Sequence, residues 1–279
     1  MSQPHRFAAI TREPEKYRVQ IIYTQIDRDA NNYPKFTSHS YHVNDKQYFY
    51  PASTVKLPTA LLALEKINEL AIPGLNRDTT MLTGADSAMQ TPALSDPSSP
   101  TGLPSVAHYI RKILLVSDND AFNRLYEFLG QQALNESMHE KGYQDTRIFH
   151  RLSVARNAEE NAKTNSVRFI NDDGKVVYEQ AAQTSGVDYA YSEPILLGHA
   201  ERVGGERLER PKDFSLNNAF SLQNLHDVTQ AVMFPVSVPE FKRFSLSEDD
   251  YQFLYRNMSA YPQESAIPDY ADTDRYPDG

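Results

Sequence analysis

The stretch "YFYPASTVKLPTALLALEKINEL", residues 48–70, predicts a helix with an unusual charge near its start. Apolar residues recur at three- and four-residue steps after Lys56, as they do on the buried face of an amphipathic helix. Lys56 itself lies near the N-terminus of this helix, where the helix dipole disfavours a positive charge. Ser53 precedes it by three residues, so the two side chains would share one face. The pattern predicts a helix that begins near Ser53 and places a hydroxyl beside an amine.

This pairing has a chemical use, because a serine hydroxyl is a weak nucleophile until a neighbouring base takes its proton. A lysine can be that base if its pKa is lowered, and the positive end of a helix acts in that direction. The alternative is that Ser53 is a plain N-cap and Lys56 a solvated charge. A Ser-x-x-Lys match is expected roughly once by chance in a chain of this composition, so the motif alone decides little.

A second motif, Ser-Asp-Asn at residues 117–119, is more specific. Chance alone would produce it roughly 0.09 times in a chain of this composition. It falls between two stretches of helical spacing, residues 105–116 and 121–130, where side chains can turn into a cleft. The alternative interpretation is an N-cap for the second of these helices.

The rest of the chain predicts a mixed α/β domain. Alternating apolar residues predict an N-terminal β-hairpin within residues 17–50, and a helical lobe is expected over residues 53–150. Residues 79–104 are rich in Ser and Pro, which favours a surface loop, and Asp173-Gly174 favours the turn of a second hairpin. Further helices are expected over residues 131–141, 222–234 and 247–258.

Composition excludes several function classes. The 279 residues suit a single domain over residues 1–279, and the net charge of −9 leaves no basic stripe for a nucleic acid. The absence of cysteine excludes thiolate catalysis and cysteine-bound zinc. His39 and His42 have the wrong spacing for a shared strand face, so we expect no metal and no cofactor. No apolar run approaches the ~18 residues of a transmembrane segment.

Together the two motifs resemble those of the class A β-lactamases and penicillin-binding proteins. "YFYPASTVKLPTALLALEKI" and "LLVSDNDAFNRLYEFLG" closely resemble β-lactamase-related serine hydrolases of the Bacteroidetes-type branch, and the resemblance covers residues 17 to about 150. It implies an α/β (α+β) fold, in which an antiparallel sheet with flanking helices packs beside an all-helical lobe.

The resemblance also implies roles for four residues. Ser53 would be the acylated nucleophile, and its backbone N–H would form half of the oxyanion hole. Lys56 would be the activating base. Ser117 would relay a proton to the leaving nitrogen, and Asn119 would bind the substrate amide.

The sequence departs from the family pattern in two places. The third family motif, Lys-[Thr/Ser]-Gly on a late strand, is absent, and Lys163-Thr164-Asn165 comes too early and lacks the glycine. We therefore expect the C-terminal strands of the family fold to be missing. The family also uses a glutamate for deacylation, and only Glu159 and Glu160 are available, outside the usual Glu-x-x-x-Asn arrangement. Two adjacent glutamates are more typical of a solvated helix face, and an acyl-enzyme without such a base would linger.

The sequence thus favours a β-lactamase-like serine hydrolase that acts through an acyl-enzyme on β-lactams or related amides. One alternative is a cell-wall D-Ala-D-Ala peptidase, that is, a penicillin-binding protein. Another is a non-catalytic ligand-binding or sensing pseudoenzyme of the same fold. A small-molecule substrate is the expected partner. Cell-wall chemistry favours the periplasm or cell surface, and a cytoplasmic location stays open.

Overall fold

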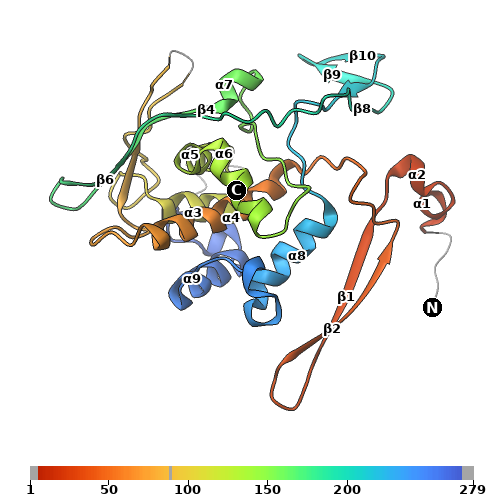
Figure 1. Ribbon diagram of the computed structural model, residues 1–279, viewed down its shortest axis with the longest axis horizontal. Helices are drawn as coiled ribbons and strands as arrows, with labels where there is room; N and C mark the ends of the chain where they lie inside the picture. The colour runs from red at the N-terminus through yellow and green to blue at the C-terminus, as the bar shows by residue number, and fades with distance from the viewer. Residues whose placement is uncertain (1–5, 88–89, 272–279) are drawn as a thin grey trace.

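A helical body, several small antiparallel sheets and a projecting hairpin make up the chain (Figure 1). The computed structural model describes residues 6–87 and 90–271. Its α-helices are α1 (Ala8–Arg12), α2 (Pro14–Tyr17), α3 (Lys56–Leu70), α4 (Val106–Val116), α5 (Asn119–Leu129), α6 (Gln131–Glu140), α7 (Ala158–Ala162), α8 (Leu222–Met233) and α9 (Glu248–Ser259). Its strands are β1 (Ile21–Arg28), β2 (Pro34–Tyr41), β3 (Thr80–Thr83), β4 (Lys163–Thr164), β5 (Val167–Ile170), β6 (Val176–Gln180), β7 (Gln183–Thr184), β8 (Leu196–Leu197), β9 (Glu201–Val203), β10 (Glu206–Leu208) and β11 (Lys212–Asp213). The mixed α/β class expected from the sequence is confirmed.

The helical body is built around α3, which packs against α4, α5 and α6. Most of α3 is buried because its leucines and alanines cover more than one face of the helix. Aromatic rings complete the core, and Phe128 of α5 meets Phe169 of β5 edge-on, with 5.1 Å between the ring centroids. The helices predicted around residues 105–116, 121–130 and 131–141 all form. This body carries both sequence motifs.

The N-terminal hairpin of β1 and β2 forms as predicted. Its antiparallel register runs from Ile21 opposite Tyr41 to Arg28 opposite Pro34. It projects from the helical body toward the lower right of Figure 1, and α8 packs against β1. The expectation of one domain over residues 1–279 stays a prediction, and both ends of that range lie outside the described residues.

A three-stranded antiparallel sheet, in the order β3-β5-β6, covers the far side of the helical body. β5 and β6 form the second predicted hairpin, and Gly174 in its turn has a φ of +75°, which glycine adopts without strain. β3 corrects the expectation of an uninterrupted loop over residues 79–104. It spans only four residues, too few for alternation to be visible in the sequence, and its stability comes from pairing with β5.

The C-terminal helices α8 and α9 begin at the serines that their sequences indicate, Ser221 and Ser247. Asp250 completes the predicted capping box of α9 and ties this helix to Asn68 and Arg77. Burial would raise the pKa of Asp250, but hydrogen bonds from Asn68, Ser247 and Arg77 outweigh it and hold that pKa below its ordinary value. Within residues 6–87 and 90–271, no strand follows β11 and no helix is both long and apolar enough to cross a bilayer.

Candidate active site

Ser53 lies in a single 3₁₀ turn, η1 (Ala52–Val55), that leads directly into α3. The α-helix therefore begins at Lys56, three residues later than Ser53, and a 3₁₀ turn of this kind is common at a helix start. The turn is closed by Thr54, whose N–H and hydroxyl both donate to the Pro51 carbonyl. Ala52 has a φ of +45°, an uncommon conformation for a residue with a Cβ. The chain thus enters α3 through a tight bend that directs Ser53 toward Lys56.

The Ser-Asp-Asn motif forms the reversal between α4 and α5. Ser117 ends α4 in a left-handed conformation, with a φ of +57°. Asp118 is the N-cap of α5, and its carboxylate accepts a hydrogen bond from the Ala121 N–H at 2.8 Å. The capping interpretation is thus right for Asp118. Because Asp118 caps α5, the side chains of its neighbours Ser117 and Asn119 can turn toward α3.

The two motifs meet at the amine of Lys56. Its Nζ lies 3.1 Å from Ser53 Oγ, 3.0 Å from Ser117 Oγ and 2.7 Å from Asn119 Oδ1. It also donates to the Ser117 backbone carbonyl. Because an ammonium has three N–H groups, four oxygen atoms around one amine exceed what it can donate to at once. These distances show that the structure brings together all four residues for which the sequence suggested roles: Ser53, Lys56, Ser117 and Asn119.

Burial is the main influence on the proton affinity of Lys56, which is only 2% exposed. Removal from water lowers its pKa, while the nearby Asp118 carboxylate acts in the opposite direction, and the net result is a pKa below the ordinary lysine value. Sequence reasoning predicted a lowered pKa but attributed it to the helix N-terminus. The structure assigns the leading effect to desolvation.

Ser153 is a member of this group that sequence reasoning missed. Asn119 Nδ2 donates to Ser153 Oγ at 2.7 Å, while Asn119 Oδ1 accepts from Lys56. Ser153 also has a left-handed backbone, with a φ of +56°. The two contacts fix which way the Asn119 amide faces, because its oxygen must point to the amine and its nitrogen to the serine. No motif surrounds Ser153 in the sequence, and its contact with Asn119 and its left-handed backbone identify it only in the folded chain.

A buried ion pair anchors the loop that carries Ser153. Arg151, 6% exposed, donates to Glu127, 4% exposed, with the closest nitrogen–oxygen distance at 2.6 Å. Glu127 also accepts a hydrogen bond from the Asn165 N–H. Arg151 in turn donates to the backbone carbonyl of Lys163 at 2.7 Å. The pair thus fixes both ends of residues 151–165 to α5.

Both candidate deacylating glutamates belong to α7, where Glu159 is exposed and Glu160 is partly buried. Glu159 pairs with Lys163 at 2.7 Å, and this contact lowers its pKa. Glu160 accepts from the Asn157 N–H in a capping box. Among the described hydrogen bonds and ion pairs, neither glutamate contacts Ser53, Lys56 or their partners. The structure therefore does not bring Glu159 or Glu160 to the candidate site, and it places Lys163 of the Lys-Thr-Asn triplet with Glu159.

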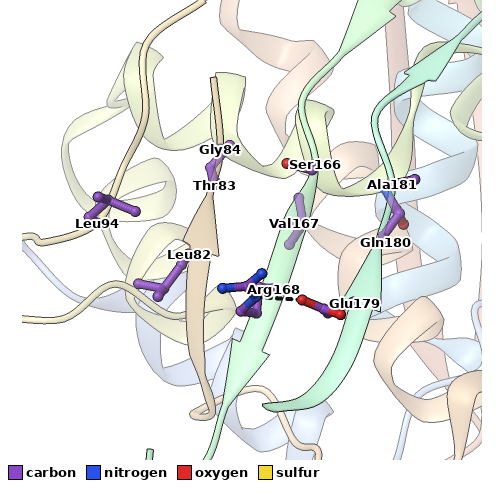
Figure 2. Close-up of a pocket in the computed structure, with 10 residues that line it drawn as sticks. All are labelled: Leu82, Thr83, Gly84, Leu94, Ser166, Val167, Arg168, Glu179, Gln180 and Ala181. Carbon is purple, nitrogen blue, oxygen red and sulfur yellow. Dashed lines mark hydrogen bonds and ion pairs between the residues drawn. The ribbon is translucent and has the colours of Figure 1, made fainter. Parts of the chain in front are cut away.

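A surface hollow on the three-stranded sheet offers no competing chemistry. It has a volume of about 430 Å³ and lies on the β3-β5-β6 sheet. Figure 2 shows Leu82 and Leu94 on one side and the exposed Arg168–Glu179 ion pair on the other. Its lining provides no hydroxyl beside a base of the kind found at Lys56. In the part of the chain that the structure describes, no cluster of three or more His, Asp or Glu side chains could hold a metal ion.

Comparison with known proteins shows which family this chain is similar to. A family model described as the beta-lactamase enzyme family matches residues 7–186. A crystal structure of a beta lactamase from Burkholderia vietnamiensis is 14% identical, with a TM-score of 0.43, and the match covers 94% of this chain and 69% of that one. A structure of L2 complexed with relebactam is also 14% identical, with a TM-score of 0.40, covering 92% and 68%. Both scores lie below 0.5, so family membership depends on the family model. A search of curated proteins found no match.

Proposed function

The chain belongs to the beta-lactamase enzyme family, and on that premise we propose that it is a serine hydrolase that forms an acyl-enzyme at Ser53. The observation that carries the proposal is the position of the Lys56 amine, which is buried and within hydrogen-bond distance of the Ser53, Ser117 and Asn119 side chains. A nucleophile, a base and a hydroxyl relay within reach of one another are what acyl transfer requires.

In the proposed acylation step, the neutral Lys56 amine takes the proton of Ser53 while Oγ attacks the substrate carbonyl carbon. The tetrahedral intermediate then collapses, and its carbon–nitrogen bond breaks. Ser117 donates its hydroxyl proton to the leaving nitrogen and recovers a proton from the Lys56 ammonium. Lys56 is neutral again at the end of the step. Its lowered pKa supports this role, because more of the amine is then unprotonated at neutral pH.

Substrate binding falls to Asn119 in this proposal. Its Nδ2 carries two hydrogens, and one is donated to Ser153. The second hydrogen can donate to an amide carbonyl of the substrate. Ser153 and Lys56 together hold the Asn119 amide in the orientation that this contact needs.

Deacylation is the step for which the site is least equipped. The side chains of Glu159 and Glu160 contact Lys163 and Asn157, and no described hydrogen bond or ion pair joins either glutamate to the four site residues. We therefore propose a long-lived acyl-enzyme rather than rapid turnover of β-lactams. The lack of a glutamate at the site among the described residues favours a second candidate function, a penicillin-binding or D-Ala-D-Ala peptidase role. A protein with that role can hydrolyse a bound penicillin slowly and still perform its function. Such a cell-wall substrate would place the protein in the periplasm or at the cell surface.

The test is intact-mass measurement after incubation with benzylpenicillin. Opening of the β-lactam ring expels no fragment, so an adduct adds the whole mass of the drug. We expect an adduct on the wild-type chain that persists while free drug is removed. Ser53→Ala should give none, and Ser40→Ala, at a serine of the projecting hairpin, should react like the wild type.

Three other outcomes would change the proposal. A transient adduct with consumption of the drug would indicate efficient deacylation and a working β-lactamase. An adduct on Ser53→Ala would refute Ser53 as the nucleophile. Reversible binding of penicillin without an adduct, retained in Ser53→Ala, would support a non-catalytic binding or sensing protein instead.

A further inference from the structure

A chain of alternating charges runs from the loop before α4 to the Ser-Asp-Asn motif. Lys112, in the last turns of α4, contacts the Asp96 carboxylate at 3.0 Å and the Asp118 carboxylate at 3.5 Å. Asp96 also accepts from Ser98 and lies 3.4 Å from the buried His108. The mechanism proposed above uses none of the side chains of Lys112, Asp96 or His108.

This charge chain ends next to the candidate base. Asp118 lies between the two motif residues whose side chains contact Lys56. The groups that touch the Lys56 amine, from Ser53, Ser117 and Asn119, are all uncharged. Among the described residues, Asp118 is the charged neighbour that acts on Lys56, and its carboxylate acts to raise the pKa of the amine. Burial has the larger effect on the pKa of Lys56, and the residues that hold Asp118 modulate it in the opposite direction.

We infer that Lys112 and Asp96 are positioning residues that hold Asp118 and set the electrostatic field at the Lys56 amine. The inference rests on the proposed role of Lys56 as the base of acylation. The positive charge of Lys112 partly compensates the negative charge of Asp118. Asp96 weakens this compensation because it pairs with the same ammonium. The ammonium of Lys112 thus pairs with two carboxylates at once.

The arrangement gives the two residues opposite effects on Lys56. Lys112→Met removes a positive charge and leaves Asp118 uncompensated, so the pKa of Lys56 should rise. Asp96→Asn removes a negative charge and leaves Lys112 to pair with Asp118 alone, so the same pKa should fall. Asp120 is the remaining acidic group that acts on Lys112, and neither substitution changes it. A loss of folding stability would not produce shifts of opposite sign.

The experiment is an NMR titration of the full chain labelled with ¹³C at the lysine Cε. Substitution of Lys56 by Met in the labelled chain identifies its signal among the 11 lysines. We expect the titration midpoint of Lys56 to rise by about half a pH unit in Lys112→Met and to fall by a similar amount in Asp96→Asn. Half a unit is about a threefold change in the neutral fraction at a given pH.

Lys141→Met is the matched control. Lys141 pairs with Glu65 at 2.6 Å, and its side chain is 15% exposed, the same as that of Lys112. It belongs to a different pair, so the Lys56 midpoint should stay at the wild-type value. Lys112→Arg keeps the positive charge and should also leave the midpoint close to wild type.

Shifts of the same sign in Lys112→Met and Asp96→Asn, or shifts no larger than that of Lys141→Met, would overturn the inference. If Lys112→Met fails to fold, Asp96→Asn still tests the inference, because its Lys56 midpoint must fall below the wild-type value. The titration requires no turnover, so it gives a result even for a chain that does not react with penicillin. The mass experiment then reports separately on the proposed function, and the two failures are distinguishable.

Discussion

Replacing Glu127 with glutamine should reveal how strongly the buried ion pair with Arg151 holds the loop behind the candidate site. Glutamine has nearly the same shape as glutamate but carries no charge, so the substitution leaves the Arg151 guanidinium buried with a neutral partner. The Asn165 N–H also loses a charged acceptor. The loop would then be held by weaker contacts at both of its ends.

The magnitude follows from the burial of the pair. Two unit charges about 4 Å apart attract by about 4 kcal/mol at an effective dielectric constant of about 20, and by about 1 kcal/mol in bulk water. Removing one partner of a buried pair costs about 3–5 kcal/mol, because the remaining charge stays desolvated. The glutamine oxygen still accepts from Arg151, so we expect a loss near the lower end, about 3 kcal/mol. This corresponds to a fall in Tm of about 6–12 °C.

The chain contains a matched control for this prediction. Arg168 and Glu179 are also 2.6 Å apart at their closest atoms, but they are 57% and 56% exposed (Figure 2). Glu179→Gln should therefore cost less than about 1 kcal/mol. Urea unfolding at pH 7, followed by circular dichroism, compares the two variants with the wild type. A difference of less than about 1 kcal/mol between Glu127→Gln and Glu179→Gln would refute the reasoning from burial.

Three further predictions concern single residues. Burial lowers the pKa of Lys66 to about 8. Between pH 8 and 10 the folded chain therefore loses the Lys66 proton while the unfolded chain still binds it, so stability rises with pH. Over that range, urea unfolding should show the wild type gaining about 2 kcal/mol relative to Lys66→Met. The lowered pKa of Asp250 adds stability that declines as the pH falls below about 4. Asp250→Asn should therefore be about 1–2 kcal/mol less stable than wild type at pH 7, and this difference should shrink progressively as the pH is lowered below about 4. Ser153→Ala removes an acceptor from Asn119 and should slow acylation by a fluorescent penicillin by about 3- to 10-fold. The midpoint of the acylation rate plotted against pH should stay at the wild-type value. An unchanged rate would show that Ser153 does not orient the amide.

The sequence predicts the elements whose signals are local. Helical spacing identifies α3 to α6, α8 and α9, and turn residues such as Gly174 identify the two hairpins. β3 escapes prediction because four residues carry too little alternation, and its partner β5 is far away along the chain. The two-residue strands between residues 183 and 213 escape for the same reason, since pairing rather than composition defines them.

The candidate site divides in the same way. Ser53, Lys56, Ser117 and Asn119 stand in short motifs, so their residue types and spacing are enough to suggest the chemistry. Ser153 and Asp96 join them only through tertiary contacts, and nothing in their flanking residues distinguishes them from ordinary loop positions. Charges that act through a second residue leave no local pattern, because their effect depends on distances that only the folded chain sets.

The left-handed residues around the site have a consequence for laboratory evolution. Ala52, Ser117 and Ser153 each hold a backbone conformation that costs a residue with a Cβ about 1–2 kcal/mol and costs glycine little. A screen of random variants for heat resistance alone would therefore favour glycine at all three positions. At position 52 that change removes only a methyl group. At positions 117 and 153 it removes a hydroxyl that contacts Lys56 or Asn119, so selection for robustness would erase part of the site.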